Sequence, residues 1–308
     1  MRRREEILRL TPYVQTLVIL LGVPFWIISV GCVYLGWAIA TRRILPDPEL
    51  TAALVIVSVF ITGSTFAYND YADRDLDRTN LRKKNSLLVW GLIEPRAVLR
   101  LSVVLAALGI LLSLLINATF AAMMGLCVLL SILYSNPRVK LKSRGGWDLL
   151  VNMVGIGVVL PLAGWSVARP VQEFPVLYLP SIFLGIGALY ILTTLADYKT
   201  DKASGVCSVV VRLGKGAAVG LGLAFLVLDT ISLLLIGYFN YLVPWSIMRL
   251  LWPPLVAQWV IYYFLIIRGG ATYKNVIRTI LLLAGIYIVD TGIFLLMFCG
   301  VPSVPGWS

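Results

Sequence analysis

Apolar runs long enough to cross a bilayer as helices alternate with short charged stretches along this sequence. An α-helix needs about 20 predominantly apolar residues to span the hydrocarbon core, and in lipid only helices and closed barrels satisfy their backbone hydrogen bonds. Hydrophobic residues make up 59% of the 308 and charged residues 13%, about half the charged fraction of a soluble domain. The sequence therefore predicts an all-α integral membrane protein, with one bundle forming a single domain over residues 1–308.

Nine of these runs are expected to be membrane-spanning helices. Their approximate bounds are residues 12–40, 50–69, 97–115, 118–135, 147–166, 175–196, 215–238, 243–267 and 276–299. The first run is long and contains Gly22, Val23 and Pro24, so we expect it to be tilted or kinked.

The distribution of Lys and Arg predicts which helix ends face the cytoplasm. With the N-terminus placed there, 22 of the 26 basic residues fall on the cytoplasmic side. Arg42, Arg43 and Arg169 fall on the opposite side, and Arg249 is ambiguous at the start of a helix. This asymmetry predicts a multi-pass protein of the cell membrane with an N-in, C-out orientation. The long charged loops, where we expect the mouth of the active site, then face the cytoplasm.

The composition also excludes several kinds of site and partner. There is no histidine, and the four cysteines are scattered without a CxxC spacing. Ser-His catalysis and imidazole-bound zinc are therefore excluded, and the cysteines indicate neither a disulfide framework nor a thiolate metal site. A bound metal must then be held mainly by oxygen, as Mg²⁺, Mn²⁺ and Ca²⁺ are. The net charge of +11 lies in short stretches without interleaved aromatic residues, so we expect no nucleic acid partner. No obligate protein partner is inferred.

An acidic motif follows the run at 50–69, where residues 69–80 read NDYADRDLDRTN. Asn69, Asp73 and Asp77 are spaced i, i+4, i+8 and would share one face of a helix, with Asp70 close to that face and Asp75 pointing away. Aligned carboxylates repel one another at a helix C-terminus, where the helix dipole already disfavours anions. A cation is therefore expected to hold them, and Mg²⁺ fits because it takes one or two carboxylates and shares its other positions with water and substrate phosphates.

A second acidic motif, DYKTDKASG, follows the run at 175–196 and places Asp197 and Asp201 at i, i+4. Asp73 and Asp197 are 124 residues apart, as are Asp77 and Asp201. This matched separation indicates a loosely repeated four-helix unit that brings the motifs face to face, where metal ions would clamp a diphosphate. The competing interpretation of the first motif is a solvated acidic helix end paired with neighbouring arginines, and it accounts less well for a matched second motif.

Basic and aromatic residues near the motifs are candidates for binding the diphosphate and the organic group attached to it. Arginine and lysine are natural phosphate ligands, and aromatic faces shelter a carbocation through contacts worth about 0.5–2 kcal/mol. The candidates are Arg78, Tyr134, Arg138, Lys140, Lys142, Tyr198 and Lys199. For any single basic residue, retention on the cytoplasmic side of the membrane is the alternative explanation.

Together these motifs resemble those of the UbiA superfamily of intramembrane prenyltransferases. The family's NDxxDxxxD motif is matched by residues 69–77, its YSxPxxxLK stretch by residues 134–142, and its DxxxD motif with a following glycine and R-L-G by residues 197–214. The resemblance covers about residues 60–220, and the nine-helix topology extends it over the chain. One departure follows the first motif, where members commonly show Arg-Pro and then Ser-Gly but this chain reads NLRKKNSLLVWG. The class of acceptor is therefore left open.

The resemblance implies Mg²⁺-dependent prenyl transfer within a single UbiA-like domain. An allylic isoprenyl diphosphate would ionise to an allylic carbocation, which alkylates a lipophilic acceptor such as an aromatic ring, a hydroxyl or another isoprenoid. Two Mg²⁺ ions are implied, with Mn²⁺ as an alternative. The implied metal ligands are Asn69, Asp70, Asp73, Asp77, Asp197 and Asp201, and the last four are also the implied catalytic residues.

Two other functions also use membrane aspartates. An ion-coupled transporter with an acidic cytoplasmic gate would place its site near the bilayer midplane on broken helices, whereas both motifs lie at helix ends. A CDP-alcohol phosphotransferase would carry Asp-Gly and Ala-Arg ahead of its acidic residues, and that longer motif is absent. Asp229 and Asp290 lie inside predicted helices, where a carboxylate is either functional or held by hydrogen bonds.

Overall fold

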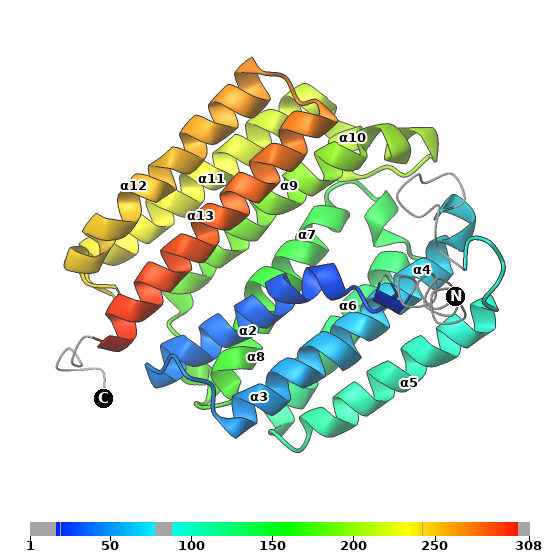
Figure 1. Cartoon of the computed structure of the whole chain (residues 1–308), viewed down its shortest axis with the longest axis horizontal. Coiled ribbons are helices and arrows are strands. Elements are labelled where there is room, and N and C mark those ends of the chain that lie inside the picture. The colour runs from blue at the N-terminus through cyan, green and yellow to red at the C-terminus, as the bar shows by residue number, and fades with distance from the viewer. Residues whose placement is uncertain (1–16, 19, 78–87, 242, 301–308) are drawn as a thin grey trace, which may run out of the picture. The chain divides into compact units, whose positions relative to one another are not determined.

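The computed structural model describes residues 17–18, 20–77, 88–241 and 243–300, and every regular element in these ranges is helical (Figure 1). Within them, eight helices are long and apolar enough to cross a membrane. These are Pro48–Asp77, Pro95–Ser113, Ala118–Ser135, Trp147–Ser166, Val176–Ala203, Lys215–Tyr238, Trp245–Arg268 and Tyr273–Gly300. The predicted all-α membrane class is confirmed.

The first predicted span, residues 12–40, is interrupted. Its beginning lies outside the described residues, and its remainder contains the 16-residue helix α2 (Trp26–Thr41), which is apolar but shorter than the other eight. A 3₁₀ turn, η1 (Val23–Phe25), precedes α2, and Gly22 has a left-handed φ of 62°. Glycine adopts a positive φ without strain, and proline lacks the backbone N–H that would continue a helix. Gly22 and Pro24 together therefore break the helix at the position where a kink was predicted.

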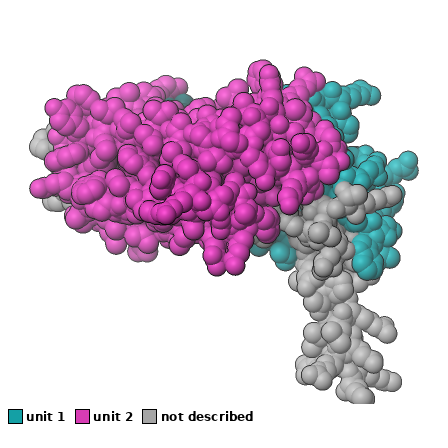
Figure 2. Space-filling model, turned by 90° about the horizontal axis from the view of Figure 1, so that it is seen from above, with its two compact units in different colours: residues 1–37, 47–141, 159–171 teal, residues 38–46, 142–158, 172–308 magenta. Residues whose placement is uncertain are grey.

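The chain divides into two compact units (Figure 2). The first comprises residues 1–37, 47–141 and 159–171, and the second comprises residues 38–46, 142–158 and 172–308. The prediction of one domain over residues 1–308 is not tested by this division and stays a prediction.

The first unit contains the helix that carries the first acidic motif. Its helices are α2 as far as Trp37, α3 (Pro48–Val55), η2 (Ile56–Thr62), α4 (Gly63–Asp77), α5 (Pro95–Ser113), α6 (Ala118–Ser135) and α8 (Leu160–Ser166). The first acidic motif's helix, α4, continues α3 through η2, a π-helical segment. It lies beside α5 and α6, and Ser102 Oγ of α5 donates a 2.8 Å hydrogen bond to the Ser64 carbonyl of α4. Small polar residues of this kind let membrane helices approach closely.

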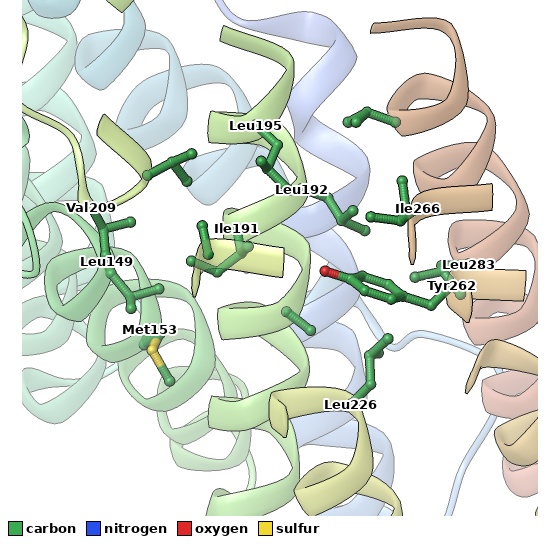
Figure 3. Packing of buried hydrophobic residues seen from close by; sticks show 14 residues of the cluster. Leu149, Met153, Ile191, Leu192, Leu195, Val209, Leu226, Tyr262, Ile266 and Leu283 are labelled. Carbon is green, nitrogen blue, oxygen red and sulfur yellow. The ribbon is translucent and has the colours of Figure 1, made fainter. Parts of the chain in front are cut away.

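The second unit is organised around the helix that carries the second acidic motif. Its helices are α7 (Trp147–Val154), η5 (Gly155–Val159) as far as residue 158, η7 (Val176–Tyr178), α9 (Leu179–Ala203), α10 (Val209–Leu213), α11 (Lys215–Tyr238), α12 (Trp245–Tyr262), η8 (Tyr263–Arg268) and α13 (Tyr273–Gly300). α9 lies beside α7, α10, α11 and α13 (Figure 1). Ile191 and Leu192 of α9 are fully buried, and they share one hydrophobic cluster with Leu149 of α7, Leu226 of α11 and Tyr262 of α12 (Figure 3). Because lipid is as apolar as these side chains, their contribution is mainly close van der Waals packing.

Two helices extend further than their apolar runs predict. The run expected at 50–69 continues as helix to Asp77, and the run expected at 175–196 continues to Ala203. The prediction stopped where charged residues begin, but backbone hydrogen bonding continues for about two further turns because it does not require apolar side chains. Both acidic motifs therefore lie on helices, in their last turns.

Candidate active site

The first acidic motif lies on α4 as its spacing predicts. Asp70 and Asp77 are 4% and 7% exposed, Asp73 is half-buried, and Asp75 is exposed. Arg74 pairs with the outward-facing Asp75, with Nη2 and Oδ2 3.7 Å apart. The competing interpretation paired the acidic helix end with neighbouring arginines. Arg74 instead pairs with Asp75, the carboxylate that points away from the face shared by Asn69, Asp73 and Asp77.

Asn69 connects the motif to a second helix. Its Nδ2 donates a 2.9 Å hydrogen bond to Ser135 Oγ at the end of α6, and Ser135 is buried. Because this bond uses the amide nitrogen, the amide oxygen is the atom of Asn69 suited to a cation. The first acidic motif and the YSxP stretch, 66 residues apart in sequence, are therefore joined within one unit.

A tight turn after α6 presents the predicted phosphate-binding residues. Asn136 Oδ1 accepts a 2.9 Å hydrogen bond from the Arg138 backbone N–H, and the Asn136 carbonyl accepts one of 2.7 Å from Lys140 N–H. Asn136 Nδ2 also donates to Tyr68 Oη on α4, at 3.2 Å. Arg138 is exposed, and Lys140 is half-buried with a left-handed φ of 45°. Non-glycine residues adopt this conformation at some cost, and the hydrogen bond from the Lys140 backbone N–H to Asn136 stabilises it here. Tyr134 is half-buried in the last turn of α6.

The second acidic motif lies on the last turns of α9. Asp197 and Asp201 are both half-buried, and Asp201 Oδ2 accepts a 2.9 Å hydrogen bond from Ser208 Oγ. The ring of Tyr198 faces ammonium groups, since Lys215 Nζ lies 4.9 Å and Lys202 Nζ 5.9 Å from its centroid. Lys199 is exposed on the same helix. Tyr198 therefore lies beside lysine side chains of α9 and α11, and its role in binding the substrate stays a prediction.

The basic stretch that follows residue 141 belongs to the second unit. Lys142, in the short helix η4 (Leu141–Ser143), is only 7% exposed. Arg212 Nη1 of the R-L-G stretch donates a 2.7 Å hydrogen bond to the Gly145 carbonyl. Arg212 therefore connects α10 to the segment just before α7 through this hydrogen bond.

Asp148 is a polar residue of this region that the sequence analysis did not single out. It is fully buried, and it accepts hydrogen bonds from Gly146 N–H at 2.7 Å, Val209 N–H at 2.8 Å and Tyr190 Oη at 3.2 Å. The signal available in the sequence was an acidic residue in the first turn of an apolar helix, where the helix dipole favours a negative charge.

The two intramembrane aspartates of unit two differ in their surroundings. Asp229 of α11 accepts hydrogen bonds from Ser181 Oγ at 2.6 Å and Tyr287 Oη at 2.9 Å. Asp290 lies one turn beyond Tyr287 on α13 and is buried, and among the described residues its carboxylate has no hydrogen-bond donor. Of the two roles considered for Asp229, the structure shows the hydrogen-bonded one.

The predicted site residues fall into groups within each unit. The first unit joins the motif of α4 to Tyr134, Arg138 and Lys140, and the second unit holds Asp197, Tyr198, Lys199, Asp201 and Lys142. Arg78 lies outside the described residues. Among the described residues, no three aspartate, glutamate or cysteine side chains are gathered as a ready-made metal site. The hard oxygen donors still fit Mg²⁺, which needs one or two carboxylates and takes other ligands from water and phosphate.

A family model decides the identity. The model of the UbiA prenyltransferase family matches residues 29–274, which include both acidic motifs and the stretch between them. The chain belongs to the UbiA prenyltransferase family. Prenyl transfer was predicted from three motifs, and the enzyme class is confirmed.

Curated members of the UbiA family share moderate identity with the chain. A protoheme IX farnesyltransferase from Edwardsiella ictaluri is 29% identical over 229 residues, which cover 70% of this chain and 74% of that protein. A 4-hydroxybenzoate octaprenyltransferase from Vesicomyosocius okutanii is 25% identical over 236 residues, covering 74% and 81%. A digeranylgeranylglyceryl phosphate synthase from Sulfurisphaera tokodaii is 28% identical over 188 residues, covering 59% and 64%. Two of these names give different acceptors, protoheme IX and 4-hydroxybenzoate, and the third gives a product, digeranylgeranylglyceryl phosphate.

Solved structures of UbiA homologues share the fold. A homologue from Archaeoglobus fulgidus bound to GPP and Mg²⁺ has a TM-score of 0.74 at 22% identity, covering 93% of this chain and all of that one. A digeranylgeranylglyceryl phosphate synthase structure has a TM-score of 0.71 at 20% identity, covering 94% and 99%. The UbiA fold thus extends over nearly the whole chain.

Proposed function

We propose that this UbiA-family enzyme transfers an isoprenyl group from an allylic isoprenyl diphosphate to a lipophilic acceptor, with Mg²⁺ as its cofactor. The observation that carries the proposal is the pairing of oxygen donors on α4 with the cationic turn after α6, through the bonds Asn69–Ser135 and Tyr68–Asn136. These two bonds tie the proposed metal ligands of α4 to the segment that carries the proposed phosphate ligands. The Archaeoglobus fulgidus homologue, which binds GPP together with Mg²⁺, supports the same combination.

The proposed ligands are the hard oxygen donors of the two helix ends. They are Asn69, Asp70, Asp73, Asp77, Asp197 and Asp201, and they are proposed to hold two ions, with Mn²⁺ as an alternative. Bound Mg²⁺ supplies neutralisation of the negative charge that develops on the departing diphosphate. The proposed role of the aspartates is to hold the metal ions that bind the leaving group.

The basic residues bind the diphosphate directly. Arg138 and Lys140 of the turn after α6, together with Lys142, Arg78 and Lys199, are proposed to donate hydrogen bonds to its oxygens. The allylic C–O bond breaks, both electrons leave with the diphosphate, and the carbocation forms a new bond to the acceptor, which releases a proton. Tyr134 and Tyr198 are the proposed aromatic neighbours of the prenyl chain and its carbocation.

The orientation is also a proposal. We infer nine spans, with α2 as the first, an N-in, C-out topology and an active site on the cytoplasmic side of the cell membrane, because basic residues concentrate on that side. Cys207 is exposed between α9 and α10, so a membrane-impermeant maleimide should label it in inside-out vesicles. Labelling only in right-side-out vesicles would contradict the orientation, and Cys207→Ser provides the background.

The acceptor is proposed only by class: an aromatic ring, a hydroxyl or another isoprenoid. Purified protein with Mg²⁺, labelled isoprenyl diphosphates of several lengths and a panel of acceptors, with lipid products identified by mass, would establish donor and acceptor together. Absence of any prenylated product across the panel, despite metal-dependent diphosphate binding, would contradict the transferase proposal for these substrate classes.

The site residues are tested by matched aspartate variants. Asp73→Asn and Asp201→Asn should each lower Mg²⁺-dependent diphosphate release by about 100-fold or more, as loss of a major electrostatic contact does. Asp75→Asn on the same helix, which points outward, should retain activity. Undiminished turnover in both Asp73→Asn and Asp201→Asn would refute the two-motif mechanism.

A further inference from the structure

We propose that Ser208 and Asp148 are positioning residues that orient the carboxylate of Asp201. Neither belongs to an acidic motif, and neither is proposed to touch metal or substrate. The inference rests on the proposed function, in which Asp201 is a metal ligand. It adds a second layer of residues that sets how that ligand is presented.

Ser208 acts on Asp201 directly. Its Oγ donates a 2.9 Å hydrogen bond to Asp201 Oδ2, and Ser208 is almost fully buried. A carboxylate on the last turn of a helix can rotate about two side-chain torsions, and a donor at one oxygen restricts that rotation. The bond therefore fixes which oxygen of Asp201 turns toward Ser208 and which direction the other faces.

The backbone between Asp201 and Ser208 cannot hold the serine by itself. α9 ends at Ala203, and Gly205 has a left-handed φ of 73°. Within this turn, Val206 N–H donates a 2.9 Å bond to the Asp201 carbonyl. No helix spans residues 204–208, so the location of Ser208 depends on where α10 is anchored.

Asp148 provides that anchor. Its Oδ2 accepts a 2.8 Å hydrogen bond from Val209 N–H, the residue next to Ser208. Asp148 is itself held in place, because Gly146 N–H donates to Oδ1 at 2.7 Å and Tyr190 Oη donates to Oδ2 at 3.2 Å. Tyr190 lies on α9, so a single buried carboxylate connects α7, α9 and the start of α10.

A parallel bond strengthens the same junction. Arg212 Nη1 of α10 donates to the Gly145 carbonyl at 2.7 Å, and a Cβ on Gly145 would lie 2.7 Å from the Arg212 Cβ. The junction of α7 and α10 therefore holds two hydrogen bonds, one from Val209 to Asp148 and one from Arg212 to Gly145. The resulting chain of contacts runs from α7 through Asp148, Val209 and Ser208 to Asp201.

The first test removes the hydroxyl and keeps the fold. Ser208→Ala should raise the Mg²⁺ concentration for half-maximal diphosphate release by about 10-fold, the usual effect of losing a residue that orients a metal ligand, with little change in thermal unfolding. Ser208→Thr, which keeps the hydroxyl, should recover most of the wild-type Mg²⁺ dependence. Ser204→Ala is the matched control, because its hydroxyl lies in the same turn but donates to the carbonyls of Thr200 and Asp201, not to the carboxylate.

The second test asks whether Asp148 acts through Ser208. Asp148→Asn should raise the same Mg²⁺ concentration, and the double variant Asp148→Asn/Ser208→Ala should be no worse than the more affected single variant, because both changes act on one oxygen. Fully multiplicative effects in the double variant would show that Asp148 acts elsewhere and would overturn its assigned role.

The controls separate failure of this inference from failure of the proposed function. If Asp201→Asn shifts the Mg²⁺ dependence but Ser208→Ala does not, the positioning role is wrong and the metal role of Asp201 stands. If Asp201→Asn itself leaves the Mg²⁺ dependence unchanged, the proposed metal ligand is wrong, and the positioning inference falls with it.

Discussion

Gly36 of α2 and Gly164 of α8 allow two helix backbones to meet, and replacing either by alanine should destabilise the first unit. A Cβ on Gly36 would lie 2.9 Å from the Trp165 backbone nitrogen, and one on Gly164 would lie 2.9 Å from Val33 Cα. Non-bonded carbon atoms prefer about 3.5–4.0 Å, and the neighbours here are backbone atoms that cannot rotate away. The helices would have to separate by about 0.6 Å or more. Overpacking usually costs about 1–3 kcal/mol, and we expect the upper end.

Thermal unfolding of purified Gly36→Ala in detergent, followed by circular dichroism, measures this cost. Gly31→Ala is the matched control, because it lies on the same helix and its added Cβ would have no described heavy atom within 4 Å. The control should be unchanged or slightly more stable, since alanine is the better helix former by about 1 kcal/mol. Equal unfolding midpoints for Gly36→Ala and Gly31→Ala would refute the close contact of α2 with α8.

Three further predictions concern the site and its support. Ser135→Ala removes the partner of Asn69 and should raise the KM for the diphosphate substrate about five-fold, equivalent to one hydrogen bond of about 1 kcal/mol; an unchanged KM would refute the coupling of α4 to α6. Tyr287→Phe leaves Asp229 with one fewer donor and should lower the free energy of unfolding by about 1–2 kcal/mol, whereas the exposed Tyr263→Phe should not, and denaturant unfolding compares them. EDTA should abolish binding of a labelled isoprenyl diphosphate and Mg²⁺ should restore it; binding of equal affinity without metal would contradict metal-dependent recognition.

The membrane class and the positions of most helices could be predicted from the sequence because both depend on local composition. A run of apolar residues at 118–135 becomes a helix with those same limits, since lipid leaves the backbone no alternative. Helix ends were less predictable: α4 and α9 each continue through charged residues to Asp77 and Ala203. Hydropathy predicts where the apolar part of a helix ends, but the backbone hydrogen bonds of the helix can continue beyond that point.

The residues of the acidic motifs could also be chosen from the sequence, because i, i+4 spacing is a local property of a helix. Their supporting contacts could not. Ser135 lies 66 residues from Asn69, and Val209 lies 61 residues from Asp148, so both pairings depend on how helices pack. The neighbours of Tyr198 also depend on packing, because Lys215, 17 residues further along the chain, lies 4.9 Å from the centroid of its ring.

The central claim is that the aspartates of α4 and α9 support Mg²⁺-dependent transfer of a prenyl group. Its most direct test is the release of diphosphate from a labelled allylic isoprenyl diphosphate by purified enzyme, measured against Mg²⁺ concentration for wild type, Asp73→Asn and Asp75→Asn. We expect metal-dependent release by wild type and Asp75→Asn, with almost none by Asp73→Asn. Release that is independent of Mg²⁺, or equal in all three proteins, would contradict it.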